Sequence, residues 1–196
     1  MNIQIRKLTP ELYRDYLHFF DTTPHSTNKE EHKCYCVCWS NDNYKDKDYS
    51  TAEKRRVIAK EYVINSNIQG YLAYYENKVV GWCNTNTKLQ CFQCLSWKMF
   101  MKSIHKEEEF PNEKVKSVFC FAIKPEMRGK GIARLLLNQV CQDAEKDGFD
   151  YVEAYPNDTF INTEEDFMGP VGLYEKLGFS IDYKTEKRLV MRKKLK

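Results

Sequence analysis

The chain has 196 residues, of which 42% are hydrophobic and 30% charged, the balance of a globular protein and not of a disordered chain. Lysine and arginine exceed aspartate and glutamate by only 31 to 28, so the formal charge of +3 does not indicate a nucleic-acid partner. No apolar run approaches the roughly 18 residues of a membrane span, and residues 1–10 do not resemble a signal peptide, so we expect a cytoplasmic protein with no membrane partner.

The first fifty residues predict a strand, a helix and a long connection. Residues 3–8 alternate apolar and polar side chains as a half-buried strand does, and Thr9 followed by Pro10 is typical of a helix N-cap and first turn. Residues 21–48 are polar and irregular except for residues 34–39, and long connections of this kind are often functional. The helix that begins after Thr9 would bury Leu12, Tyr16, Phe19 and Phe20.

The next segment predicts a helix followed by a β-hairpin. Ser50 and Glu53 match a capping box, and the apolar residues that follow keep helical spacing to about Ile64. Beyond the hairpin, residues 86–112 show no clear period, and their charged run at 106–109 is typical of a solvated surface. The hairpin consists of a strand at residues 70–75, a turn at Glu76-Asn77 and a second strand at residues 78–85.

The second half of the chain predicts a strand, helix, strand unit and a closing hairpin. Residues 115–123 are a near-continuous apolar run bounded by Pro125, the pattern of a strand buried on both faces. Residues 132–146 place apolar side chains at helical spacing, and Gly148 suits the position just past the helix. The later elements are a strand at 150–155, a helix at 170–177 closed by Gly178, and a hairpin at 179–195 that turns near Glu186.

A glycine-containing loop joins the buried strand to its helix. It reads Arg128-Gly129-Lys130-Gly131-Ile132-Ala133, and its two glycines let backbone N–H groups approach a ligand at a helix N-terminus. Because the helix end is partly positive and Arg128 and Lys130 add full charges, phosphate is the anion that fits best. The six residues also fit an ordinary strand-to-helix turn, and they match neither the P-loop nor the dinucleotide fingerprint.

Two separate motifs resemble those of the GNAT acetyltransferase superfamily. Arg128, Gly131 and Ala133 meet the pattern Arg/Gln-x-x-Gly-x-Gly/Ala, and the stretch Leu173-Tyr174-Glu175-Lys176-Leu177-Gly178-Phe179 is similar to the second signature. The resemblance is firm over residues 115–195, the motif-bearing core of what we expect to be one domain, 1–196. It implies an α/β fold with a mixed, mostly antiparallel sheet whose central βαβ unit binds acetyl-CoA.

The resemblance also implies an activity and roles for individual residues. A primary amine of a small molecule or peptide would attack the thioester of acetyl-CoA directly, with acetyl-CoA as cosubstrate, no metal, and a backbone N–H near residues 120–122 polarising the carbonyl. Tyr174 would protonate the departing thiolate; the alternative is a helix tyrosine packed against the sheet. The pantetheine arm would pair with backbone groups of Phe121, Ala122 and Ile123, and the pyrophosphate with Arg128, Gly129, Lys130, Gly131, Ile132 and Ala133.

The chain departs from the superfamily's pattern at two positions. Val115 stands about where histone-type relatives place a glutamate, so the general base is open. Phe167 stands where many relatives carry an asparagine that contacts pantetheine, and Asn157 or Asn162 is a candidate replacement. The candidates for the base are Glu113, Glu153 and a water molecule.

Five of the eight cysteines form two groups whose role the sequence leaves open. Cys34, Cys36 and Cys38 would share one face of an extended segment, and Cys91 and Cys94 form a Cys-x-x-Cys pair. Cys34 and Cys38 together with Cys91 and Cys94 have the spacing of a four-thiolate zinc site. Ordinary packing of small buried side chains explains the same cysteines, and we favour this interpretation. We expect the first group, Cys34, Cys36 and Cys38, to lie beside an acceptor pocket.

Two other functions stay open at this stage. One is a noncatalytic acyl-CoA-binding or sensing module on the same fold, and the other is a zinc-dependent interaction protein. We expect Cys120, on the strand that binds the cosubstrate, to be a core thiol and not a nucleophile. Neither the acceptor nor the oligomeric state, a homodimer included, follows from the sequence.

Overall fold

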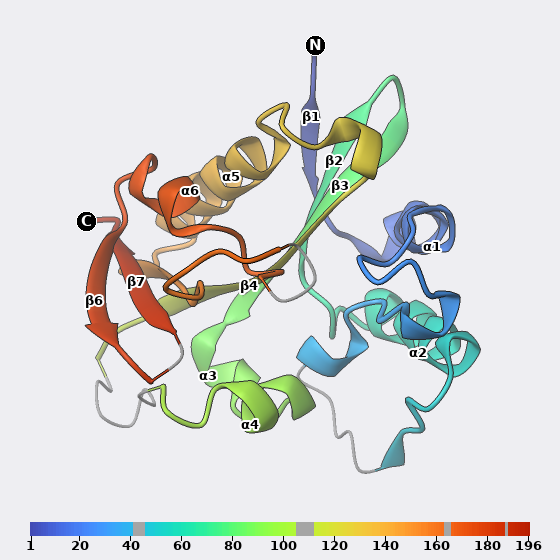
Figure 1. Cartoon of the computed structure of the whole chain (residues 1–196), viewed down its shortest axis with the longest axis horizontal. Helices are drawn as coiled ribbons and strands as arrows, with labels where there is room; N and C mark the ends of the chain where they lie inside the picture. The colour runs from blue at the N-terminus through green and yellow to red at the C-terminus, as the bar shows by residue number, and fades with distance from the viewer. Residues whose placement is uncertain (41–45, 105–111, 163–165, 187) are drawn as a thin grey trace.

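A seven-stranded sheet forms the centre of the molecule (Figure 1). The computed structural model describes residues 1–40, 46–104, 112–162, 166–186 and 188–196. The strand order is β1-β2-β3-β4-β5-β7-β6, and all neighbours are antiparallel except β4 and β5, so the mixed, mostly antiparallel α/β sheet is confirmed. The strands are β1 (Gln4–Lys7), β2 (Gly70–Tyr75), β3 (Lys78–Thr87), β4 (Val115–Ile123), β5 (Tyr151–Ala154), β6 (Ser180–Lys184) and β7 (Leu189–Lys194).

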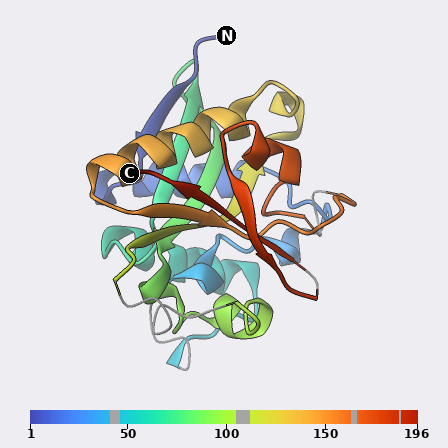
Figure 2. The ribbon, with the colours of Figure 1, turned by 90° about the vertical axis from the view of Figure 1, so that its left-hand side faces the viewer.

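Helices cover both faces of the sheet (Figures 1 and 2). On one face lie α5 (Ile132–Lys146) and α6 (Val171–Glu175), and on the other lie α1 (Tyr13–Thr22), α2 (Ala52–Ile64), α3 (Lys88–Cys91) and α4 (Leu95–Phe100). Within the described ranges, no helix is long and apolar enough to cross a membrane. Single 3-10 turns occur at Pro10–Leu12, Glu30–His32, Val37–Trp39 and Pro125–Met127.

Most helix boundaries follow the predicted caps. Thr9 precedes the 3-10 turn that leads into α1, with a proline at its first position. Gly148 follows α5 with a φ of 76°, the left-handed conformation that glycine adopts without strain. The start of α2 differs from the prediction, since Thr51 and not Ser50 is the N-cap: its hydroxyl accepts the Lys54 N–H at 3.2 Å.

The hairpin of β2 and β3 is confirmed, and the region after it contains helices that the sequence did not reveal. Glu76 and Asn77 have φ values of 47° and 60°, as a tight primed turn requires. β3 runs two residues past its predicted end, and α3 and α4 follow it directly. These helices have four and six residues, too few for an apolar repeat to be recognised. The charged run at 106–109 lies outside the described residues.

β3 divides the core between the two faces of the sheet. Successive side chains of a strand point to opposite faces. Trp82 packs edge-on against Tyr16 of α1, with ring centroids 4.9 Å apart, whereas the next residue, Cys83, belongs to the apolar core beneath α5. The protein therefore has two apolar cores, one on each side of the sheet.

The sheet opens between β4 and β5. The two strands pair only over residues 115–118 and 151–154, and β4 then continues to Ile123 with β3 on one side. On the other side, the Phe121 N–H donates to the Phe167 carbonyl at 2.8 Å. The C-terminal half of β4 therefore borders a gap in the sheet, which is where the candidate site lies.

Candidate active site

A cavity of about 930 Å³ lies where β4 and β5 separate. Residues 120–123 of β4 line it. Cys120 and Ala122 pack with the core beneath α1, whereas Phe121 and Ile123 pack with the core beneath α5. Because consecutive residues of one strand line the same cavity, the cavity is bordered by both faces of the sheet.

One end of the cavity is the glycine loop before α5. Gly129 and Gly131 have φ values of 74° and 79°, and a Cβ on either would meet no heavy atom within 4 Å. The left-handed backbone, and not lack of space, is therefore what requires glycine here. No side chain in the described part of the chain caps the first turn of α5, so the N–H groups of residues 132–134 are available to an anion.

Cationic side chains surround this end. Arg128 Nε donates to the Ile123 carbonyl at 3.3 Å, which holds the guanidinium against the end of β4. Lys130, predicted to bind the pyrophosphate, does not line the cavity, and its ammonium contacts the Met127 sulfur at 3.8 Å. The cations that do line this end are Arg128, Arg134 and Lys176. Arg134 and Lys176 were not identified from the sequence as ligand-binding residues, although Arg134 lies beside one recognised motif and Lys176 within the other.

Close packing between β3 and α5 positions the glycine loop. A Cβ on Gly81 would stand 2.7 Å from Ile123 Cδ1 and 3.0 Å from Ile132 Cγ2. Ile132, the first residue of α5, is 2% exposed and so is anchored in the core. The glycine on β3 thus lets the start of α5 approach the sheet.

Tyr174 lies on α6 behind the cavity wall. Its side chain is fully buried, its hydroxyl donates to the Met168 carbonyl, and its ring packs against Phe179 with centroids 5.4 Å apart. Burial raises the pKa of Tyr174 well above its usual value. Gly172 and Leu173 line the cavity but Tyr174 does not, so a proton-donor role requires its hydroxyl to exchange the Met168 carbonyl for the thiolate.

The wall opposite the glycine loop consists of aromatic rings and thiols. A hydrogen bond with Cys36, together with burial, raises the pKa of Cys34 well above its usual value, and a hydrogen bond with Cys120 raises that of Cys36. Burial raises the pKa of Cys38 to about 11. These thiols are protonated at neutral pH and are poor nucleophiles. We call this the aromatic-thiol wall; it is formed by Phe20, Cys34, Cys36, Cys38, Trp39, Phe100 and Cys120.

Asp166 is the one carboxylate among the described residues that line the cavity. It accepts hydrogen bonds from Asn157 Nδ2 and from the N–H groups of Ile161 at 2.6 Å and Asn162 at 3.1 Å. The two asparagines, either of which was a candidate for the pantetheine contact, thus hydrogen-bond Asp166 and do not line the cavity themselves. The Asp166 side chain is committed to holding this loop.

Glu113 and Glu153 lie away from the cavity in an ion-pair network. Glu153 is fully buried, and its carboxylate is 2.5 Å from Arg192 Nε and 2.8 Å from Lys88 Nζ. Glu113 accepts a hydrogen bond from Arg192 Nη1 at 2.7 Å. Neither carboxylate lines the cavity, so the geometry does not support either as the general base.

His25 is the imidazole that lines the cavity among the described residues, and sequence reasoning missed it. The Thr27 N–H donates to His25 Nδ1 at 3.3 Å, and the Thr27 hydroxyl lies 2.8 Å from the same nitrogen. Because Nδ1 accepts a hydrogen bond, the proton of the neutral ring is on Nε2. Neither nitrogen is then free to accept a proton from a substrate. A lone histidine in an irregular loop gives no sequence signal.

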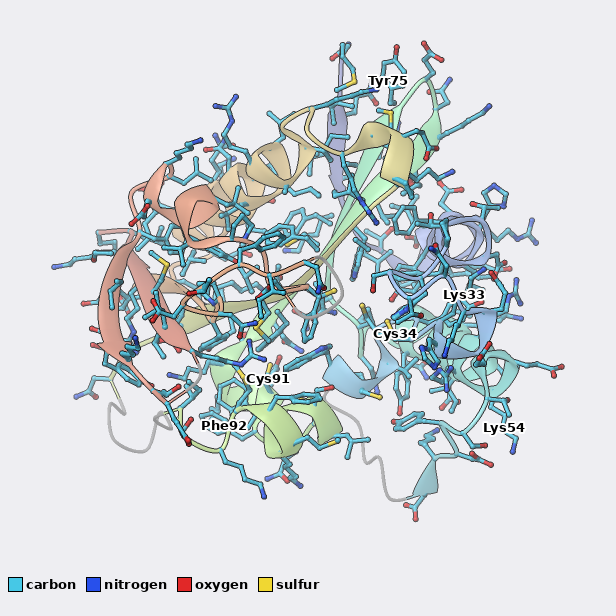
Figure 3. The ribbon with its side chains drawn as sticks, viewed as in Figure 1. Lys33, Cys34, Lys54, Tyr75, Cys91 and Phe92 are labelled. Atoms are coloured by element: carbon cyan, nitrogen blue, oxygen red, sulfur yellow. The ribbon has the colours of Figure 1, made fainter. Side chains whose placement is uncertain are left out.

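The thiols of the Cys-x-x-Cys pair donate to backbone carbonyls. Cys94 Sγ donates to the Cys91 carbonyl at 2.8 Å, and Cys91 Sγ donates to the Thr87 carbonyl at 3.2 Å. Figure 3 shows Cys34 beside the α1 and α2 layer and Cys91 on α3. Across the described ranges, no three His, Cys, Asp or Glu side chains are grouped so that they hold a metal ion. The four-thiolate zinc hypothesis gains no support.

A family model matches most of the chain. Residues 9–179 match the model of the acetyltransferase (GNAT) family. The chain belongs to the GNAT acetyltransferase family. It is therefore an acyltransferase, and the motifs at Arg128–Ala133 and Leu173–Phe179 fall inside the matched region. Comparison with curated proteins gives no match.

Solved structures share the GNAT fold at low identity. A GNAT acetyltransferase from Streptococcus pneumoniae is 16% identical, with all of both chains covered and a TM-score of 0.54. PaiA N-acetyltransferase from Thermoplasma acidophilum, in complex with coenzyme A, is 19% identical over 99% of each chain, with a TM-score of 0.55. The yncA protein of Salmonella typhimurium, with its cofactor acetyl-CoA, is 13% identical over 99% of this chain and 94% of its own chain, with a TM-score of 0.50.

Proposed function

We propose that this GNAT protein is an acetyl-CoA-dependent N-acetyltransferase that acetylates a primary amine of a small molecule or peptide. The observation that carries the proposal is the cavity along residues 120–123, which connects a cationic glycine loop to an uncharged wall. The coenzyme A and acetyl-CoA complexes of the Thermoplasma and Salmonella proteins support it. A single domain and a cytoplasmic location stay predictions, and a homodimer stays an open alternative.

The glycine-loop end suits the pyrophosphate of acetyl-CoA. The first-turn N–H groups of α5 and the guanidinium of Arg128 supply donors and positive charge, as a phosphate group requires. Phe121 and Ile123 present backbone groups on the open side of β4, because the N–H and C=O groups of every second residue in a strand point to the same neighbouring side. Since the Phe121 N–H already donates to Phe167, the pantetheine arm pairs first at Ile123 and reaches Phe121 only if the Phe167 carbonyl moves away.

The proposed reaction is a direct acetyl transfer. The amine nitrogen forms a C–N bond with the thioester carbonyl carbon, the C–S bond breaks, the nitrogen loses one proton and the CoA sulfur gains one. Tyr174 is the proposed donor of the proton to sulfur, and its raised pKa keeps it protonated over the working pH range. No nucleophilic side chain is needed, in keeping with the raised pKa values of Cys34 and Cys36.

A noncatalytic acyl-CoA-binding module is the second candidate function. Two observations favour it. The Tyr174 hydroxyl donates to the Met168 carbonyl behind the wall, and the one described lining carboxylate, Asp166, accepts hydrogen bonds from its own loop. A sensor binds acetyl-CoA as an enzyme does but acetylates nothing. The two functions therefore separate on turnover and not on binding.

Calorimetric titration with CoA and acetyl-CoA tests the site, and acetylation of a panel of amines, followed by release of the CoA thiol, tests the activity. We expect Arg128→Ala to weaken CoA binding about tenfold and Lys130→Ala to weaken it less, because only Arg128 lines the cavity. Absence of CoA binding would contradict both candidate functions. Binding without turnover of any amine would favour the sensor.

A further inference from the structure

The cavity offers different chemistry at its two ends, and the end away from the glycine loop is where an acceptor enters. Residues 20–39, α4 and Cys120 of β4 supply the aromatic-thiol wall there. Trp39 is 6% exposed and stacks on Phe119 with ring centroids 4.6 Å apart and planes 14° from parallel. The thiols of Cys34, Cys36 and Cys38 are neutral, because their pKa values are raised above the usual range. The wall thus presents uncharged thiols and aromatic surface, with Trp39 held in place by its stacking on Phe119.

A cationic acceptor would find no free carboxylate among the described side chains that line the cavity. Arg128, Arg134 and Lys176 lie at the glycine-loop end, where the proposed pyrophosphate would pair with them, and the one lining carboxylate among the described residues is that of Asp166. Lys33 is 6% exposed, and its ammonium is bound to the Asp21 carbonyl at 2.6 Å and to a Glu30 carboxylate oxygen at 2.7 Å. Asp166 already accepts three hydrogen bonds. An ammonium group would enter this space with no described carboxylate free to pair with it.

The proton of an alkylamine poses a second difficulty. A reference amine such as lysine has a pKa of about 10.4, so it is almost wholly protonated at neutral pH and needs a base before it attacks. The described lining residues provide no evident base, since Asp166 is committed to its loop and His25 accepts on Nδ1. An aromatic amine has its lone pair delocalised into the ring and is uncharged at neutral pH. It needs no base to become a nucleophile.

We propose that the acceptor is a weakly basic aromatic amine, which packs its ring against the aromatic-thiol wall and attacks as the neutral species. This inference rests on the acetyltransferase function proposed above. The aromatic nitrogen forms the amide bond to the acetyl carbon, and the thioester C–S bond breaks. The nitrogen loses its proton only after attack, when that proton has become acidic, and the CoA sulfur takes one up.

Thr23 supplies a polar contact for such an acceptor. Its side chain is 8% exposed and lines the cavity at the C-terminal end of α1. Its hydroxyl oxygen is buried and has no hydrogen-bond partner within the described part of the chain. A buried hydroxyl of this kind is costly unless a ligand or water satisfies it. The N–H of an aromatic amine is a suitable donor to it.

A pair of isomeric amines tests the proposal on the full-length protein. 4-Methylaniline and benzylamine contain the same atoms, but the first is neutral at pH 7 and the second is protonated. We expect kcat/KM at pH 7 to be about tenfold or more higher for 4-methylaniline and to stay flat from about pH 7 to 9, while that for benzylamine rises about tenfold per pH unit. Spermidine, a polycation, should be the poorest acceptor.

The outcomes distinguish this inference from the proposed function. Faster acetylation of benzylamine or spermidine than of 4-methylaniline at pH 7 would overturn the acceptor class and leave the acetyltransferase function standing. Acetyl-CoA binding without acetylation of any amine would overturn both. A flat pH profile together with preference for 4-methylaniline supports the inference.

The role of Thr23 has its own matched pair of variants. Thr23→Val keeps the shape of the side chain and removes the hydroxyl, and it should raise KM for 4-methylaniline about fivefold without changing the affinity for CoA. Thr22→Val is the control, because the Thr22 hydroxyl is exposed and donates to the His18 carbonyl. Equal KM values for the two variants would contradict the Thr23 contact, since a fold defect would alter CoA binding as well.

Discussion

Tyr174 illustrates how a recognisable residue can occupy an unexpected position. The second motif indicated a proton donor, yet the side chain is fully buried, and its hydroxyl donates to the Met168 carbonyl. Its neighbour Leu173 faces the cavity. Proton donation to sulfur would require this hydroxyl to exchange the Met168 carbonyl for the thiolate. The observed packing role and the proposed donor role therefore need two different hydrogen-bond partners for the same phenol.

Removal of the Tyr174 hydroxyl tests the donor role. Tyr174→Phe should lower kcat about a hundredfold with little change in CoA affinity, and lower the free energy of unfolding by about 1 kcal/mol through loss of the bond to Met168. Steady-state kinetics, calorimetry and urea unfolding measure the three effects. An unchanged kcat would show that the thiolate leaves without this proton.

The thiols of the aromatic-thiol wall make a prediction about pH. Cys38 is partly exposed, and its pKa of about 11 is above the usual value of 9.0. Alkylation requires the thiolate, so iodoacetamide at pH 8 should modify Cys38 about a hundredfold more slowly than free cysteine, with the rate rising as the pH approaches 11. Mass spectrometry of the native protein measures the rate, and urea-unfolded protein is the control. Rapid native alkylation at pH 8 would contradict the raised pKa.

At the scale of elements, the contact between β3 and α5 determines where the glycine loop stands. Gly81 allows Ile123 and Ile132 to pack over the strand without a side chain between them. Because Ile132 is the first residue of α5, the position of the anion-binding N–H groups depends on this contact. The motif residues need the correct loop conformation, but their distance from β4 is set by a glycine outside both motifs.

A methyl group on Gly81 should disturb this contact. In Gly81→Ala the added carbon would stand 2.7 Å from Ile123 Cδ1, so we expect a loss of about 1 to 3 kcal/mol in the free energy of unfolding and weaker CoA binding. Gly172→Ala is the stability control, because its added carbon meets no heavy atom within 4 Å, and alanine in α6 should raise stability by about 0.5 to 1 kcal/mol. Urea unfolding compares the two variants, and calorimetry measures CoA binding by Gly81→Ala against the unchanged protein. Equal stabilities of the two variants would contradict the proposed packing.

At the scale of the whole molecule, a buried ion-pair network joins elements distant in the sequence. Glu153 on β5 pairs with Arg192 on β7 and with Lys88 on α3, and Arg192 also pairs with Glu113, just before β4. Glu153 and Lys88 are at most 1% exposed. The network thus connects β5 and β7 with α3 and with the residues just before β4.

Neutralising the central carboxylate should destabilise the fold and spare the chemistry. Glu153→Gln leaves Lys88 and Arg192 without their shared anion, and we expect a loss of about 3 kcal/mol in the free energy of unfolding, with kcat of the folded enzyme retained. Asp147→Asn is the matched control: its pair with Lys7 is half exposed, at 56% and 51%, and contributes little. A large fall in kcat in folded Glu153→Gln protein would instead reinstate Glu153 as a catalytic base.

The sequence by itself determined the elements with local signals: the buried run of β4, the glycine loop, α5 ended by Gly148, and the β2 and β3 hairpin turning at Glu76-Asn77. The spacing of apolar side chains, the conformation of glycine and helix caps each depend on a few neighbouring residues, so they can be recognised in the sequence. It did not reveal α3 and α4, which are shorter than a recognisable repeat.

Only the tertiary structure decided what each polar side chain does. Glu153 looked available as a base until Arg192, 39 residues away, proved to be its partner, and Asp166 became visible only as the anchor of the loop from Asn157 to Asn162. Such partners come from contacts between distant residues, which no local pattern encodes. The same holds for the cavity itself, because it forms where β4 and β5 separate and brings residues 20–39 to face the glycine loop.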